Sequence, residues 1–284
     1  MRDGPSWPRR SERRLRPTTV NRELSVLRRA FKLGQGKLGL DPARLPVVEM
    51  LPESEPRSGF VEPDQFEAVV AALPDYLQDL ARYGYLTGWR SGAIRALRWD
   101  DINGERVTLR REHSKNRKSY TLPLRGDLAA IIERRREARA VKEEDGTTTI
   151  SELVFHRDGQ PIGDFGKAWI SACLAARLYT VLTATEAATT RGVVKIVDKA
   201  TKRTTFVKPP IFHDLRRSAA RNLRRAGIGS DVGRKITGHE TTSMWTRYSI
   251  VDETDVAAAL DKVDAFVTRQ VAQAPRKVIA FPQR

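Results

Sequence analysis

The sequence predicts a mainly α fold with small antiparallel β elements, which is an α+β class. Apolar residues recur at spacings of three and four over most of the chain, as in helices that pack on a core. Two stretches, residues 104–124 and 183–209, are instead expected to form β-hairpins. No repeat period is present, and 284 residues suffice for one large or two modest domains.

The N-terminal part is predicted to be a basic arm followed by one helix. Residues 1–16 are dense in arginine and interrupted by two prolines, which indicates disorder. The helix is expected to take Thr18 or Thr19 as its N-cap and to end at Gly34 or Gly36.

A linker is expected after this helix. Residues 41–59 contain four prolines, so we place a domain boundary near residue 57. A single helix of about 15 residues does not fold alone. The N-terminal segment is therefore either a remnant or docks elsewhere.

Beyond the boundary the pattern predicts several further helices. Pro63 fits the first turn of one of them, where its missing N–H costs nothing. The expected helices cover residues 62–73, 74–86, 89–102, 127–144, 164–182, 213–228 and 252–271.

Composition favours a polyanion as partner. Lys and Arg number 51 against 35 Asp and Glu, a net charge of +16, and such a surface attracts phosphates; the alternative is a merely soluble, highly charged protein. Cys173 is the only cysteine, which excludes an internal disulfide and a cysteine-based metal cluster. No run approaches the ~20 apolar residues that cross a bilayer, and no secretory signal begins the sequence, so we expect a soluble, intracellular protein.

Cleaving a phosphodiester without a metal requires three kinds of group. A serine or tyrosine can attack phosphorus and form a covalent intermediate. Guanidinium groups can meet the charge that grows on the non-bridging oxygens with paired hydrogen bonds. A lysine or histidine can give a proton to the departing oxygen.

The chain contains candidates for each role, widely separated. Arg90 follows TGW at an expected helix N-terminus, and Lys115 lies in the turn SKNRK; each alone is typical of a solvated surface residue. His213 and Arg216 are spaced i, i+3 and should face the same side of one helix. Tyr248 ends the stretch TGHETTSMWTRY.

That stretch is predicted to carry a short helix. Thr241, Thr242 and Ser243 are expected to cap it, and Met244 and Trp245 to seat it on the core. Elsewhere, the adjacent Asp100 and Asp101 form the nearest approach to a carboxylate pair, and we expect them to cap a helix rather than react.

Together these stretches resemble the tyrosine recombinase (phage integrase) family. TGWR…ALRWDDI is similar to that family's first arginine box, and SKNRKSYTLPL to its β2–β3 hairpin with the lysine eight residues before a proline. HDLRRSAARNL is similar to the His-x-x-Arg box. In TGHETTSMWTRY, His239 precedes Tyr248 by nine residues, as in the family's final box. The four boxes follow in family order over residues 87–248.

The resemblance implies a metal-independent reaction with no cofactor, in which Tyr248 forms a 3′-phosphotyrosyl link. It further implies a tyrosine-recombinase catalytic domain fold, preceded by a partial helical core-binding segment. The implied roles are phosphate-oxygen binding for Arg90, Arg216 and His239, protonation of the 5′-oxygen for Lys115, and acid–base assistance for His213. Among the basic residues near these motifs, the expected DNA contacts are Arg217, Arg221, Arg224, Arg117 and Lys118.

The implied domains are a basic arm (1–17), a partial core-binding segment with linker (18–57), a catalytic domain (58–270) and a C-terminal tail (271–284). Residues 183–209 form an insertion that contacts DNA, contacts a partner protomer or only decorates the surface.

The chain departs from the family at Ala93, where the family commonly has an acidic residue, and in its short N-terminal part.

The implied partners are double-stranded DNA and further copies of the chain, as a tetramer on DNA, with accessory directionality or DNA-bending proteins. The tail helix has an apolar face that either packs on a neighbouring protomer or docks on its own core. The protein would act in the cytoplasm of a bacterial cell, encoded by that cell, a phage or a mobile element.

Two alternatives remain open. A type IB topoisomerase uses a similar constellation to relax supercoiled DNA without a specific site. A truncated or degenerate relative, or a helix-turn-helix regulator, would bind DNA without cutting it.

Overall fold

The computed structural model describes residues 15, 17–53, 59–113, 118–198, 200–248, 251 and 253–273. The chain divides into two compact units, Met1–Arg57 and Ser58–Arg284. Each is described by itself below.

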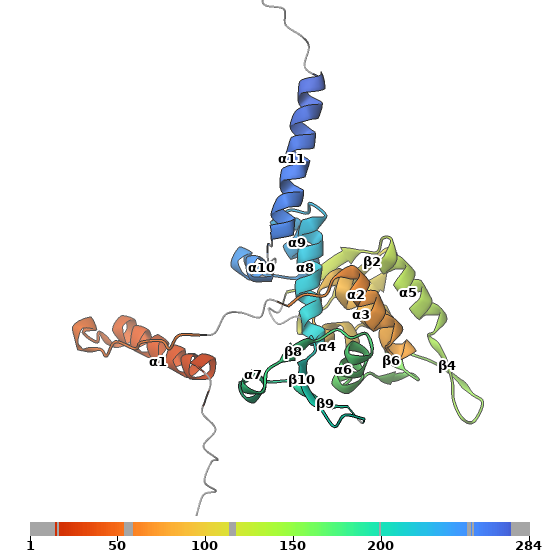
Figure 1. Cartoon of the computed structure of the whole chain (residues 1–284), viewed down its shortest axis with the longest axis horizontal. Coiled ribbons are helices and arrows are strands. Elements are labelled where there is room, and N and C mark those ends of the chain that lie inside the picture. The colour runs from red at the N-terminus through yellow and green to blue at the C-terminus, as the bar shows by residue number, and fades with distance from the viewer. Residues whose placement is uncertain are drawn as a thin grey trace, which may run out of the picture. The chain divides into compact units, whose positions relative to one another are not determined.

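The first unit contains one long helix, α1 (Pro17–Leu38), and an extended return (Figure 1). The helix passes through Gly34, so the expectation that it ends at Gly34 or Gly36 is wrong. It ends where Gly39 takes a left-handed conformation (φ +64°), which glycine adopts without strain. The amide of Asn21 ties the return to the helix, since its Nδ2 donates to the Leu51 carbonyl (2.8 Å) and its Oδ1 accepts from the Leu51 N–H (2.8 Å).

The second unit has a helical core. The largest buried side chains of α3 pack with those of α5 and α8, and include Tyr83, Ile131 and Leu215. The α-helices of this unit between residues 63 and 225 are α2 (Pro63–Ala71), α3 (Asp75–Thr87), α4 (Ser91–Arg95), α5 (Asp127–Glu137), α6 (Gly166–Ala175), α7 (Ala184–Thr189) and α8 (Leu215–Arg225).

Two three-stranded antiparallel sheets and two small hairpins complete the β structure. The first sheet has the order β1-β2-β3, with Val107 opposite Leu122, and the second has the order β8-β10-β9. The strands are β1 (Ile102–Asn103), β2 (Arg106–Leu109), β3 (Tyr120–Pro123), β4 (Ala140–Lys142), β5 (Thr148–Ile150), β6 (His156–Arg157), β7 (Gln160–Pro161), β8 (Thr180–Leu182), β9 (Val194–Val197) and β10 (Thr204–Lys208).

The fold class and both expected hairpins are present, but three helices were predicted too long. The helix expected at 89–102 is only α4, and the one expected at 127–144 stops at Glu137. The one expected at 164–182 stops at Ala175 and gives way to β8. In each case a short strand or turn pairs with a later segment, which no local period reveals.

The C-terminal part consists of α9 (Ser230–Thr237), α10 (Thr242–Tyr248) and α11 (Glu253–Gln273) (Figure 1). The Thr241 hydroxyl accepts from the Met244 N–H (3.2 Å), and Trp245 is buried against Gly233 of α9, so the predicted cap is confirmed for Thr241 and the predicted core contact for Trp245, whereas Met244 is only half-buried. Among the described residues, no helix combines the length and the apolar character needed to cross a bilayer.

Candidate active site

Arg216 lies where two helix C-termini converge. Its Nη1 donates to the Gly88 carbonyl at the end of α3 (2.6 Å) and to the Thr237 carbonyl at the end of α9. Its Nη2 donates to the Gly238 carbonyl (3.4 Å). The side chain is only 3% exposed. Helix C-termini carry partial negative charge, so they offset part of the cost of burying a guanidinium group.

The remaining hydrogen-bond donors of Arg216 indicate a role in binding a ligand as well as in holding the fold. Among the described residues, its Nε–H and second Nη2–H have no hydrogen-bond partner. These two parallel donors match two oxygens of one phosphate. Burial lowers the pKa of Arg216 to about 10, with a smaller contribution from the positive charge of Arg90, so the group stays charged at neutral pH.

The two helix ends are built alike, each from a Thr-Gly pair. Gly88 (φ +65°) and Gly238 (φ +66°) both take the left-handed conformation that ends a helix and frees its last carbonyls. Thr87 and Thr237 each donate their hydroxyl to the carbonyl four residues earlier (2.7 and 2.9 Å). The spare lone pair of each hydroxyl then accepts from the chain beyond the helix.

That second contact fixes the ring of His239. Nδ1 of His239 lies 2.6 Å from the Thr237 hydroxyl oxygen. The single hydroxyl proton is already given to the Gly233 carbonyl, so Nδ1 must carry a proton and donate. In the neutral ring Nε2 is therefore a bare acceptor. It is buried and has no hydrogen-bond partner among the described residues.

His239 is neutral over the physiological range. Burial, and then the nearby charges of Arg216 and Arg90, together lower its pKa to about 3. The side chain is 3% exposed. A neutral imidazole with a free Nε2 beside two guanidinium groups can accept a proton from a neighbouring hydroxyl.

Tyr248, at the end of α10, is surrounded by the other candidates. Its ring centroid lies 4.9 Å from that of His239 and 6.2 Å from that of His213. The guanidinium carbons of Arg216 and Arg217 lie 5.9 and 5.7 Å from it. The phenol of Tyr248 therefore lies among groups that can accept a proton and groups that can bind phosphate oxygens.

Arg90 stands at the start of α4 and lines a small cavity together with Arg216. The guanidinium group of Arg90 makes no hydrogen bond or ion pair with any described residue, whereas its carbonyl accepts from the N–H groups of Ala93 and Ile94 (2.9 and 3.0 Å). The cavity is also lined by Ala93, which is buried, and by two residues not predicted from sequence, His113 and Tyr120.

His213 differs from expectation in its local structure. It lies in a 3-10 turn (Phe212–Asp214) ahead of α8, not on the same α-helix as Arg216. Both side chains nevertheless face Tyr248. Partial desolvation and then the charge of Arg216 lower the pKa of His213, so it too is neutral at physiological pH.

The expected DNA contacts fall into three groups. Arg217 lies at Tyr248, and Lys118 is exposed and paired with Glu240 (3.0 Å). Arg221 and Arg224 instead pair with Asp255, and Arg221 is only 2% exposed, so the structure places neither of them free for a phosphate. Lys115 and Arg117 lie outside the described residues.

One member of the acidic pair, Asp101, has the capping role that was expected of both. Asp101 accepts from the Arg98 backbone N–H (2.8 Å) and pairs with Arg110. Among the described residues, no group of three His, Cys, Asp or Glu side chains lies as a metal site requires.

Sequence reasoning missed the residues that hold Arg216 and His239, namely Gly88, Thr237 and Gly238. A signal was present, because the dipeptide Thr-Gly directly precedes both Trp89 and His239. A glycine after a helix is a common C-cap, but only the fold shows that two such caps meet.

Comparisons with known proteins show which family and which fold this chain shares. The chain matches the phage integrase family over residues 60–254. A Haemophilus influenzae protein that bears the name integrase/recombinase is 26% identical over 272 residues, 92% of this chain and 75% of that protein.

Solved structures share the fold. A lambda integrase dimer bound to a COC′ core site has a TM-score of 0.56 at 18% identity, covering 82% of this chain and 74% of that chain. The Tn1549 transposon integrase in complex with circular intermediate DNA has a TM-score of 0.55 at 16% identity, covering 86% and 78%.

Proposed function

Because the chain belongs to the phage integrase family, whose match spans residues 60–254, we propose that it cuts and rejoins DNA through a covalent bond to Tyr248. The observation that carries the proposal is the arrangement around Tyr248. Two guanidinium groups and two neutral imidazoles face its ring. A nucleophile, an acceptor for its proton and donors for phosphate oxygens thus lie within one site.

The proposed reaction is an exchange of ester bonds. The Tyr248 oxygen forms a bond to phosphorus, and the bond from phosphorus to the 5′-oxygen breaks. The negative charge that grows on the phosphate makes the ring of His239 more basic, so its Nε2 can take the phenolic proton and donate it to a non-bridging oxygen, while His213 assists as an acid–base group. Arg90 and the free Nε–H and Nη2–H of Arg216 bind the other non-bridging oxygen, while Lys115 gives a proton to the departing 5′-oxygen, which leaves as the 5′-hydroxyl. Reversal with a new 5′-hydroxyl rejoins the strand.

The partners proposed are double-stranded DNA and further copies of the chain. The net charge of +16 supports a polyanion. Lambda integrase has been solved as a dimer on a core site and as a tetramer on a Holliday junction, and this chain shares the fold.

The proposal is tested with a library of nicked duplexes whose core sequence is randomised. Wild-type protein should leave an SDS-resistant adduct, and sequencing the trapped DNA gives the preferred site. Tyr248→Phe removes only the nucleophilic oxygen, so it should abolish the adduct and still shift the selected duplex in a gel. An adduct formed by the Phe variant would contradict the assignment.

The same material separates the alternatives. A type IB topoisomerase would relax supercoiled plasmid that lacks the selected site, whereas a recombinase would not. A non-catalytic relative would shift DNA and give no adduct from any member of the library.

A further inference from the structure

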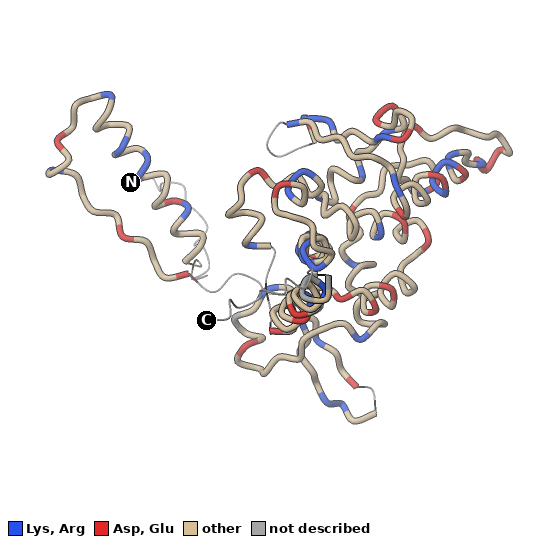
Figure 2. Tube along the Cα trace, turned by 90° about the horizontal axis from the view of Figure 1, so that it is seen from above, with Lys and Arg blue, Asp and Glu red and all other residues tan. Residues whose placement is uncertain are grey.

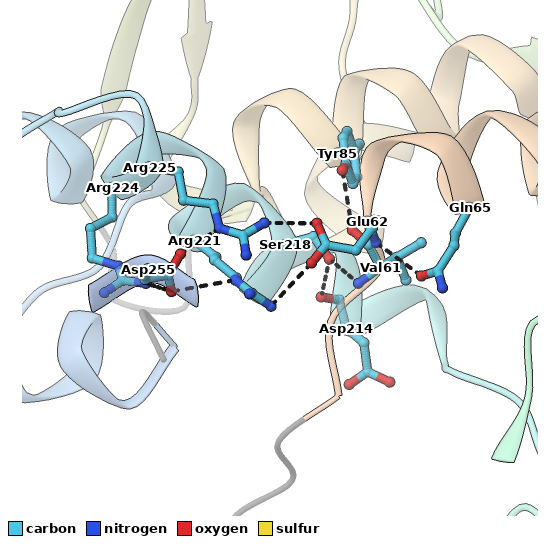
Figure 3. Close-up of polar contacts among 10 residues, drawn as sticks. All are labelled: Val61, Glu62, Gln65, Tyr85, Asp214, Ser218, Arg221, Arg224, Arg225 and Asp255. Atoms are coloured by element: carbon cyan, nitrogen blue, oxygen red, sulfur yellow. Dashed lines mark hydrogen bonds and ion pairs between the residues drawn. The ribbon is translucent and has the colours of Figure 1, made fainter. Parts of the chain in front are cut away.

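A cluster of charged residues joins three parts of the second unit away from Tyr248. Figure 3 shows the Asp255 carboxylate, on the first turn of α11, among Arg221, Arg224 and Arg225 of α8. Arg225 Nε lies 2.6 Å from Oδ1 of Asp255, Arg224 pairs with Oδ2, and Arg221 Nε lies 3.9 Å from Oδ2. The Asp255 side chain is 8% exposed.

Two of these arginines, Arg221 and Arg225, also pair with a second carboxylate near the start of the second unit. Glu62, directly before α2, lies 2.8 Å from Arg225 Nη1 and 3.5 Å from Arg221 Nη1 (Figure 3). Its neighbour Val61 is fixed by a hydrogen bond from its N–H to the Ser218 hydroxyl (2.8 Å) and one from the Tyr85 hydroxyl to its carbonyl (3.1 Å).

Asp255 is the principal anchor of α11. Among the described side chains of α11, Asp255 and Lys262 make its polar contacts with α8. The large apolar side chains of α11 that the structure describes, from Val256 to Val267, are at least half exposed, and none of them is in the buried core. Beyond Asp255, a cavity of about 420 Å³ is lined by Ala258, Ala259 and Lys262 of α11 and by Arg224 and Arg225 of α8. The helix is therefore held mainly by charge at its first turn.

Tyr248 lies between two anchors. On one side Trp245 is buried against Gly233, which fixes α10. On the other, seven residues later, Asp255 fixes the first turn of α11. A nucleophile at the end of a seven-residue helix keeps its position only when the chain on both sides is held.

We propose that Asp255 is a positioning residue that holds Tyr248 at Arg216 and His239, and that Glu62 supports it through Arg221 and Arg225. The inference rests on the proposed function of Tyr248. It adds a residue that touches neither DNA nor the reacting atoms.

The shared arginines make the two carboxylates depend on each other. Arg221 is nearly fully buried, with its guanidinium carbon 3.3 Å from the centroid of the Phe60 ring. Glu62 and Asp255 both pair with this buried charge, so removing either carboxylate weakens the pairing of the same guanidinium group. The effects of Asp255→Asn and Glu62→Gln should therefore not be additive in the double variant, because the two carboxylates share Arg221 and Arg225.

The first experiment measures adduct formation in a single turnover at saturating concentrations of the selected nicked duplex. Asp255→Asn should lower this rate about 10- to 100-fold, as misplaced reacting groups do, without changing Kd or Tm. Asp255→Glu should recover most of the rate. The matched control is Asp261→Asn, an exposed carboxylate on the same helix, which should behave as wild type.

A second readout needs no DNA. Hydrogen exchange in the free protein should speed up across α11 in Asp255→Asn, because a detached helix frays. Glu62→Gln should have a smaller effect of the same kind although Glu62 makes no contact with α11, and Asp64→Asn should have none.

Unchanged rate and exchange in Asp255→Asn would overturn the inference. A lower rate that is accompanied by a lower Tm, and that Asp255→Glu does not recover, would also overturn the inference, because it would indicate damage to the fold. If wild-type protein gives no adduct, the proposed function fails instead, and the exchange experiment still decides whether Asp255 anchors α11.

Discussion

Arg216 combines burial with charge, and its surroundings explain how. Removing a guanidinium group from water is costly unless hydrogen bonds replace the solvent. Three carbonyls from two helix ends supply these bonds, and no carboxylate of the described residues pairs with Arg216 to compete with a phosphate. Lysine could not replace it, since an ammonium group lacks the planar fork that bridges fixed carbonyls and two phosphate oxygens.

Thr237 offers the sharpest test at the scale of one residue. In Thr237→Val the methyl group that packs near Gly88 is kept and the hydroxyl is lost. Nδ1–H of His239 then has no acceptor, and a buried unpaired donor costs about 1–3 kcal/mol. The ring should turn or change tautomer, so we expect adduct formation to slow about 10- to 100-fold, by analogy with lost orienting partners of other histidines.

Thr246→Val is the matched control for that substitution. Thr246 also donates its hydroxyl to a carbonyl four residues earlier, but it is exposed and contacts no candidate residue. The Thr246→Val variant should form the adduct at the same rate as wild type. A Thr237→Val protein as fast as wild type would show that the orientation of His239 does not limit the reaction.

Sequence located the candidate reacting residues better than the residues that hold them. His239 and Tyr248 follow from a fixed spacing within one motif. The environment of Arg221, by contrast, was not predicted from the sequence. Arg221 follows Arg216 by five residues, about 140° around the helix, so it cannot share the face of Arg216. Its partner Asp255 comes from a helix that sequence alone could not place beside it.

At the scale of elements, the C-terminal end of α3 helps to fix the positions of the site residues, because it packs closely against α8 and α9. A methyl group on Gly88 would lie 3.1 Å from Cβ of Ala219 and 3.3 Å from Cγ2 of Thr237. Gly88→Ala should therefore combine the strain of a left-handed alanine, about 1–2 kcal/mol, with overpacking of about 1–3 kcal/mol. Urea unfolding at neutral pH should show the summed loss, and adduct formation should fall because the Gly88 carbonyl moves from Arg216.

Gly104→Ala separates the two contributions. Gly104 has a similar left-handed conformation (φ +55°) in the same unit, but nothing lies within 4 Å of an added methyl group. This variant should lose only the strain and keep its activity. Equal losses in the two variants would mean that α3, α8 and α9 are not tightly packed at Gly88.

The elements that sequence missed are short strands. β4 and β5 have three residues each and meet across the turn at Gly146 (φ +83°). Three residues are too few to show an alternating pattern, and the basic stretch before them continues a helical one. Long amphipathic helices such as α3 were found because many residues share one period.

For the whole molecule, the excess of positive charge is distributed rather than confined to the site. Figure 2 shows Lys and Arg on most elements of the second unit, with Asp and Glu interspersed. Several arginines are held in ion pairs, such as Arg82 with Glu67 and Arg134 with Asp79. DNA affinity is therefore expected to depend on a subset of the cations, among which Arg90 stands out because its guanidinium group has no partner among the described residues.

The apolar face of α11 gives the last prediction, because the described residues leave it uncovered. Leu260, Val263 and Phe266 are about 60% exposed, so docking on the chain's own core, one of the two expectations for this helix, does not occur in this structure. An exposed apolar strip of this kind favours contact with a second copy. Leu260→Asp should shift complexes on the selected duplex from several protomers toward one, as measured by mass photometry. Thr268→Asp adds the same charge at an exposed position off this strip and should not. If both variants assemble as wild type does, the strip is not the contact between copies.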